Sequence, residues 1–192
     1  MRMRAIASLA LALCPASLSA QDTSTAKWGQ VGGWSIRVDR SVGNGCFASQ
    51  LYEDGTSLRV GFDKSKQTIY FMIGNAAWRS LEVGKVYRMR FVFDGEKSYN
   101  GELTGLKLGS VVFLDHSDVS IDFTKDFMQR NGVRVYYQGN QITHLSLSNT
   151  YAAIAEVLNC QREINNAGGQ GGPQPAPSGD PFSSGKRDPF SR

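Results

Sequence analysis

The strongest constraint on the fold is a series of segments in which apolar and polar residues alternate. Residues 34–39 (WSIRVD), 57–62 (SLRVGF) and 86–93 (VYRMRFVF) show this pattern most clearly. Successive side chains of an extended strand point to opposite faces, so alternation at every second position predicts strands with one face in a core and the other in water.

Other segments are predicted to be strands because they are apolar and bounded by turn residues. The Asp54-Gly55 pair predicts a tight hairpin turn, since these residues accept the positive φ that such a turn requires. The further strands are expected at residues 46–52, 68–73, 103–108, 110–114, 133–137 and 141–147.

Two segments have helical rather than alternating spacing. Residues 122–130 place Phe123 and Phe127 four positions apart, and residues 149–164 carry an apolar stripe that includes Cys160. We therefore expect a mainly β fold. It is an antiparallel β-sandwich or curled sheet, with one short helix and a C-terminal helix packed on the sheet.

Residues 1–20 have the organisation of a signal peptide: two arginines, an apolar run over residues 5–13, and small residues ending at Ala20. The run is too short to span a membrane, so we expect a periplasmic or secreted bacterial protein without a transmembrane span. The segment ending at Cys14 also resembles a lipoprotein box. We expect no lipid anchor there, because Leu13 is larger than the residue that normally precedes a lipidated cysteine.

The remaining chain divides into a single β-rich domain (residues 21–164) and a Gly/Pro/Ser-rich tail (residues 165–192). We expect the tail to be disordered, because it has too few aliphatic residues to offset the entropy of ordering. The net charge of +4 falls to +2 once Arg2 and Arg4 leave with the signal peptide. This charge argues against nucleic acid as a partner, since such binding requires clustered positive charge.

The tail contains a short repeat, Asp180-Pro181-Phe182-Ser183 followed by Asp188-Pro189-Phe190-Ser191. Our interpretation is a solvated tail without a specific role. The alternative is a bivalent peptide ligand in which the two phenylalanines act as anchors.

Cys46 and Cys160 are the cysteines that remain after cleavage of the signal peptide. In an oxidising compartment we expect them to form a disulfide. The chain-entropy model assigns about 4–5 kcal/mol to a bond that closes so long a loop. Two buried free thiols are the alternative.

Candidate catalytic residues are few. The chain has two histidines, His116 and His144, and no known hydrolase, zinc or nucleotide-binding motif. Asp115-His116-Ser117-Asp118 contains the residue types of a hydrolytic triad, but neighbours in sequence cannot adopt triad geometry, so we interpret it as a polar loop. His144 is expected to be a hydrogen-bonded strand residue. We therefore expect that the protein is not an enzyme and that it binds neither a cofactor nor a metal ion.

Arginines recur at the polar positions of the expected strands, which makes a binding surface the better functional hypothesis. Arginine and tyrosine are common at interaction hot spots and suit acidic groups. An ordinary solvated face, with acidic residues interspersed, is the alternative. The candidate residues are Arg37, Arg59, Arg88, Arg90, Arg134 and Tyr136.

Five local motifs together resemble the invasion-associated locus B family, a group of small secreted alphaproteobacterial proteins. The motifs are Gly33-Trp34-x-Ile36, Cys46-x-Ala48, Asp54-Gly55-Thr56, Leu145-Ser146-Leu147-Ser148-Asn149 and Val157-Leu158-x-Cys160-Gln161. The resemblance implies a periplasmic or envelope-associated β protein, linked in some pathogens to host-cell invasion, with no established catalytic residues. We therefore expect a non-catalytic module that binds a protein or an envelope component. A secreted hydrolase, or an inhibitor of one, is the alternative.

Overall fold

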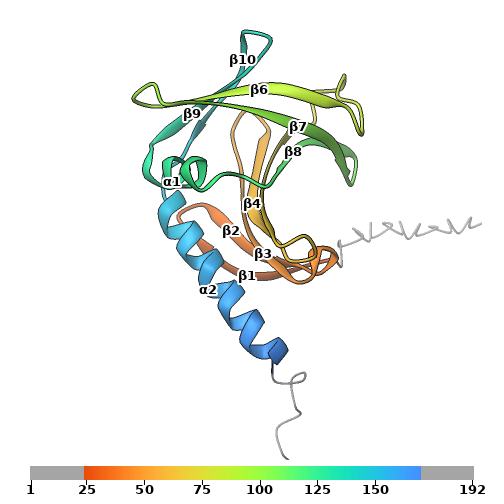
Figure 1. Ribbon diagram of the computed structural model, residues 1–192, viewed down its shortest axis with the longest axis vertical. Helices are drawn as coiled ribbons and strands as arrows, with labels where there is room; N and C mark the ends of the chain where they lie inside the picture. The colour runs from red at the N-terminus through yellow and green to blue at the C-terminus, as the bar shows by residue number, and fades with distance from the viewer. Residues whose placement is uncertain (1–23, 170–192) are drawn as a thin grey trace, which may run out of the picture.

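The computed structural model describes residues 24–169, which form one antiparallel sheet of ten strands, two α-helices and a short 3-10 helix (Figure 1). The strand order is β1-β2-β3-β4-β5-β8-β7-β6-β9-β10, so β1 and β10 are the edges and the sheet is not closed. The strands are β1 (Thr25–Val31), β2 (Trp34–Asp39), β3 (Gly45–Leu51), β4 (Thr56–Asp63), β5 (Thr68–Asn75), β6 (Val86–Phe93), β7 (Ser98–Leu108), β8 (Val111–Ser117), β9 (Gly132–Tyr137) and β10 (Asn140–Ser146).

The sheet curls strongly, so that β6 and β7 arch over β1, β2 and β3 (Figure 1). Its inner face carries the apolar residues of the alternating pattern, which meet across the strands; Ile36 pairs with Ala48, Ala48 with Val60, and Val60 with Phe71. All four are buried in the main core. The expected mainly antiparallel β fold is therefore confirmed, in its curled single-sheet form rather than as a sandwich.

Strand β1 was not predicted from the alternation. Its pairing with β2 shifts register between Lys27 and Gly29, and this irregularity breaks the period of two. Ala26 and Trp28 nevertheless pack against the core.

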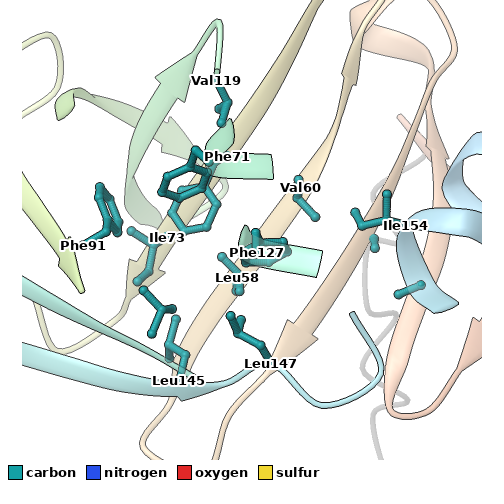
Figure 2. Close-up of a cluster of buried hydrophobic side chains, with 14 of the residues drawn as sticks. Leu58, Val60, Phe71, Ile73, Phe91, Val119, Phe127, Leu145, Leu147 and Ile154 are labelled. Carbon is teal, nitrogen blue, oxygen red and sulfur yellow. The ribbon is translucent and has the colours of Figure 1, made fainter. Parts of the chain in front are cut away.

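Helix α1 (Ile121–Gln129) lies on the inner side of the curl and fills it with aromatic rings. Ser120 caps the helix, since its Oγ accepts a hydrogen bond from the backbone N–H of Phe123. The rings of Phe123 and Phe127 lie 5.5 and 5.8 Å from the ring of Phe71, in edge-to-face contacts. Figure 2 shows Phe71, Phe91 and Phe127 together in this core.

Helix α2 (Thr150–Gly169) packs across β1, β2 and β3, as expected for the C-terminal helix. A Cys46–Cys160 disulfide joins it to β3, which agrees with the predicted pairing. The helix ends at Gly169 rather than at Ile164, so residues 165–169 belong to the helix and not to the tail. The expected signal peptide and residues 170–192 of the expected tail lie outside the described residues.

The polar loop expected at residues 115–118 is wrong for most of its length. Strand β8 continues to Ser117, and Asp115, His116 and Ser117 pair with Met72, Phe71 and Tyr70 of β5. The segment is too polar to be recognised as a strand from its sequence, because Asp115 and Ser117 alternate with a histidine instead of an apolar residue.

Candidate interaction surface

The six candidate residues all lie on the outer face of the sheet, since each alternates with residues that point into the core. They do not form one surface. In the strand order, β2 and β4 are separated from β6 and β9 by β5, β8 and β7. Arg37 and Arg59 therefore form one group, and Arg88, Arg90, Arg134 and Tyr136 form another.

The first group is internal rather than exposed. Arg59 forms an ion pair with Asp39, and the two side chains are only 12% and 7% exposed. The Arg59 guanidinium also donates to the Tyr70 hydroxyl (2.6 Å) and lies 3.6 Å from the centre of the Phe47 ring. We correct the prediction here: Arg59 holds the outer face of β2–β5 together and does not offer its charge to a partner.

Arg37 has a similar role beside this cluster. It is half-buried, and both Nε and Nη2 donate to the hydroxyl of Thr25 on β1, at 3.2 and 2.8 Å. Arg37 therefore ties the edge strand β1 to β2. This contact explains an outward-facing arginine at position 37 without invoking a partner protein.

Burial and hydrogen bonding act in opposite directions on the carboxylate of the ion pair. Burial alone raises the pKa of Asp39, but hydrogen bonds from the side chain and backbone N–H of Ser41 and from Arg59 lower it by more. The resulting pKa lies below the ordinary value, so Asp39 is charged at neutral pH.

The arginines of the second group are exposed and Tyr136 is half-buried; Arg88, Arg90 and Tyr136 line a shallow hollow. The hollow, named the arginine groove here, has a volume of about 430 Å³. Its outward-facing polar side chains are those of Arg88, Arg90, Asn100, Glu102, Tyr136 and Gln138.

Pairing of β6 with β9 creates the central feature of the arginine groove. Arg90 lies directly opposite Tyr136 in the register, and its guanidinium lies 4.5 Å from the centre of the tyrosine ring. This is a cation–π arrangement, which favours a guanidinium held over the tyrosine ring. The β9–β10 turn at Gln138-Gly139 closes one end of the groove, and both turn residues have positive φ.

Arg88 is the most accessible cation of the groove, with 89% of its side chain exposed. Its Nε lies 3.0 Å from the carboxylate of Glu102, which is itself 62% exposed. Exposed ion pairs contribute little to stability, about 0–1 kcal/mol, so a carboxylate from a partner can replace Glu102 at small cost.

Arg134 is also exposed and lies two residues before Tyr136 on β9, beside the groove; His144 lies opposite it on β10. The predicted position of His144 within a strand is confirmed. The structure thus brings together Arg88, Arg90 and Tyr136 in one groove and places Arg134 beside it.

Asp115, His116 and Ser117 do not converge as the members of a hydrolytic triad would. Asp115 and Ser117 share the outer face, where the Ser117 hydroxyl donates to Asp115 at 2.8 Å, and burial raises the pKa of Asp115. His116 points to the opposite face and lines a small cavity of about 150 Å³ with Asp118 and Ser120. Within residues 24–169, no group of three or more His, Cys, Asp and Glu side chains is placed to hold a metal ion.

A second hollow was missed by the sequence analysis. It opens between the β5–β6 loop and the inner face of the sheet, has a volume of about 480 Å³, and is named the mouth pocket here. Its apolar lining comes from Trp78, Leu81, Tyr87, Met89, Leu114, Tyr137 and Ile142. The available signal was two large apolar residues, Trp78 and Leu81, in a segment with no strand pattern.

These features define a class of protein: a curled antiparallel sheet filled by one short helix and covered by a disulfide-linked C-terminal helix, with an arginine-rich hollow on its outer face. No protein-family model matches the chain, and no curated protein matches its sequence. Among solved structures, the fold is similar to that of invasion associated protein B from Bartonella henselae, with a TM-score of 0.51 over 70% of this chain and 97% of that chain. At 10% identity the likeness concerns the fold alone. In the described part of the chain, neither helix is long and apolar enough to cross a membrane.

Proposed function

We propose that this protein is a non-catalytic binding module of the bacterial periplasm or envelope, which contacts an acidic segment of a protein partner through the arginine groove. The observation that supports this most directly is the Arg90–Tyr136 pair. The tyrosine ring holds the Arg90 guanidinium 4.5 Å from its centre on an exposed sheet face. A cation that is already positioned loses little side-chain entropy when a carboxylate binds it.

The rest of the groove suits the same ligand. Arg88 adds a second exposed guanidinium on the same strand, and a partner carboxylate can exchange with Glu102 for it. Guanidinium groups bind carboxylates through two parallel hydrogen bonds, which gives orientation as well as attraction. Asn100 and Gln138 supply neutral side chains at the groove walls that can hydrogen-bond to the backbone of a bound peptide.

We further propose that the chain belongs to the invasion-associated locus B family and has a role related to host interaction. Three of the residues that carry the resemblance have clear structural roles. Cys46 and Cys160 join β3 to α2, and the indole N–H of Trp34 donates to the backbone oxygen of Ser148 just before that helix. These roles, together with the likeness in fold to the Bartonella protein, support the proposal.

The test is binding of a fluorescein-labelled oligoglutamate peptide, followed by fluorescence anisotropy at low salt. Arg88→Ala together with Arg90→Ala should weaken binding by about tenfold or more, as expected for hot-spot arginines. The matched control is Lys107→Ala together with Lys125→Ala, which removes the same charge from exposed residues outside the groove. Equal losses in the two double variants would show that the peptide responds to net charge alone, and the groove proposal would then be wrong.

A further inference from the structure

The mouth pocket is a preformed apolar hollow whose lining comes from five parts of the chain. The walls come from inner-face residues of β6, β8, β9 and β10 and from the β5–β6 loop. Its volume of about 480 Å³ lies within the usual range for ligand pockets, about 300–1,000 Å³.

Local hydrogen bonds hold the loop side of the pocket in place. The backbone N–H of Trp78 donates to the backbone oxygen of Asn75 (2.9 Å), and that of Leu81 donates to the oxygen of Trp78 (3.3 Å). The N–H of Glu82 donates to the hydroxyl of Tyr87 on β6 (2.8 Å), which fixes the loop against the sheet. Little rearrangement is therefore needed before an apolar group can enter.

The pocket suits an aromatic ring. Tyr87 and Tyr137 already pack edge-to-face on its sheet side, with ring centres 5.8 Å apart, and Trp78 lies on its loop side. Aromatic rings gain from such edge-to-face contacts beyond the area that they bury.

The rim of the pocket carries one cation that an acidic ligand group can reach. Lys85 lies at the rim, forms an exposed ion pair with Glu82, and has its ammonium 5.8 Å from the centre of the Tyr87 ring. A ligand with an aromatic ring for the apolar pocket and a carboxylate for Lys85 at its rim would match this arrangement.

The chain itself contains two segments with this chemistry, Asp180-Pro181-Phe182 and Asp188-Pro189-Phe190. In an extended strand, residues two apart point to the same side, so in that conformation the aspartate and the phenylalanine of such a segment would face the same surface. Proline fixes φ between them and reduces the entropy that binding must overcome.

Chain length shows that the segment at Phe190 can reach the pocket. Ile142, in the pocket wall, precedes Thr150 by eight residues, which span at most about 29 Å. Helix α2 adds about 30 Å to Gly169. The pocket therefore lies within about 60 Å of Gly169. Phe190 follows Gly169 by 21 residues, which extend to about 70 Å.

We propose that Asp188-Pro189-Phe190 of the same chain occupies the mouth pocket, with the phenyl ring of Phe190 among Trp78, Tyr87 and Tyr137 and the carboxylate of Asp188 beside Lys85. Phe182, only 13 residues beyond Gly169, extends to about 45 Å, which is shorter than the upper limit of about 60 Å, so we assign the pocket to Phe190. The segment thus covers apolar surface that is otherwise open to solvent, and it leaves the arginine groove on the outer face accessible.

The test uses the full chain carrying Phe182→Ser and Phe190→Ser, to which a synthetic peptide of residues 184–192 is added. Binding is followed by tryptophan fluorescence, and Trp78→Phe in the same background identifies Trp78 as the reporter. We expect saturable binding, and about tenfold weaker binding to the wild-type chain, because its own tethered segment competes with the added peptide for the pocket.

Leu81→Asp in the same background should abolish binding. The matched control is Leu51→Asp, a change at a leucine that is 73% exposed and lies outside the pocket. A peptide with Phe190→Ser should not bind, and this result does not depend on whether the Leu81→Asp protein folds.

Three results would overturn the proposal. The peptide fails to bind, or it binds the wild-type chain as tightly as the double phenylalanine variant, or the wild-type chain sediments as a dimer that Phe190→Ser dissociates. The last result would assign the pocket to the segment of a second copy. None of these measurements involves the arginine groove, so they are independent of the proposed function.

Discussion

The hydroxyl of Thr143 donates a 3.0 Å hydrogen bond to the carboxylate of Asp54, and this contact joins the edge strand β10 to the hairpin between β3 and β4. The Tyr52 hydroxyl donates to the backbone oxygen of Ser146 on the same strand, at 2.8 Å. The pairing of strands leaves the sheet open, and these side chains hold its two halves together across the opening.

Thr143→Val should lower the free energy of unfolding by about 1 kcal/mol, the usual contribution of one such hydrogen bond. The loss is modest because Asp54 keeps its two bonds from the backbone N–H and hydroxyl of Thr56. Urea denaturation measures it. Thr104→Val, at an exposed outer-face position of β7, is the control and should change stability by less than about 0.5 kcal/mol. Equal effects of the two substitutions would show that the contact with Asp54 does not stabilise the fold.

Replacing both Cys46 and Cys160 by alanine should lower the free energy of unfolding by about 2–5 kcal/mol. The bond fixes α2 to β3, where the side chain of Gln161 also accepts a hydrogen bond from the backbone N–H of Cys46 at 2.9 Å. Guanidinium denaturation of the two proteins measures the loss. Thiol labelling of the unfolded, unreduced protein gives an independent check, and two reactive thiols would contradict the disulfide.

Asp39→Asn should cost about 3 kcal/mol, because it leaves the Arg59 guanidinium with little solvent and no carboxylate. Glu102→Gln, which breaks the exposed pair with Arg88, is the matched control and should cost less than about 1 kcal/mol.

The Asp39 carboxylate makes the stability of the fold depend on pH in the acid range. Its pKa is lower in the folded state than the unfolded value of about 4, so the stabilisation that its ion pair and hydrogen bonds contribute is complete above about pH 4. It is lost as the pH falls through the lower folded pKa. Urea denaturation from pH 6 downwards should therefore show a shallower loss of stability in Asp39→Asn than in the wild type. Parallel profiles would show that Asp39 is not held charged by its partners.

The strands with the most regular alternation of apolar and polar residues are those that the sequence predicts best. Strand β6 was predicted at its observed bounds, Val86–Phe93, because every second residue, Tyr87, Met89, Phe91 and Phe93, is apolar and faces the core. The arginines of the groove lie on the same strand and were found for the same reason. The mouth pocket was not found, since Trp78 and Leu81 belong to a loop whose course over the sheet depends on tertiary contacts that no local period encodes.

The prediction for Arg59, which lies outside the groove, was wrong for a different reason. Alternation placed Arg59 on the outer face correctly, but it carries no information on whether neighbouring strands cover that face. Asp39, Phe47 and Tyr70 come from three other strands and bury the guanidinium of Arg59. Strand order was needed to separate an internal arginine from an exposed one.

Neither histidine should be required for binding. His116 points into a small cavity on the inner face and His144 lies on the outer face opposite Arg134, so the two are on different sides of the sheet. His116→Ala together with His144→Ala should bind the oligoglutamate peptide within about twofold of wild type, because guanidinium groups carry the attraction. Arg88→Ala together with Arg90→Ala should lose about tenfold or more in the same assay. A general-base histidine would instead contribute about 100-fold or more to a hydrolytic rate. If the histidine variant folds but loses binding while the arginine variant keeps it, the binding-module proposal is wrong.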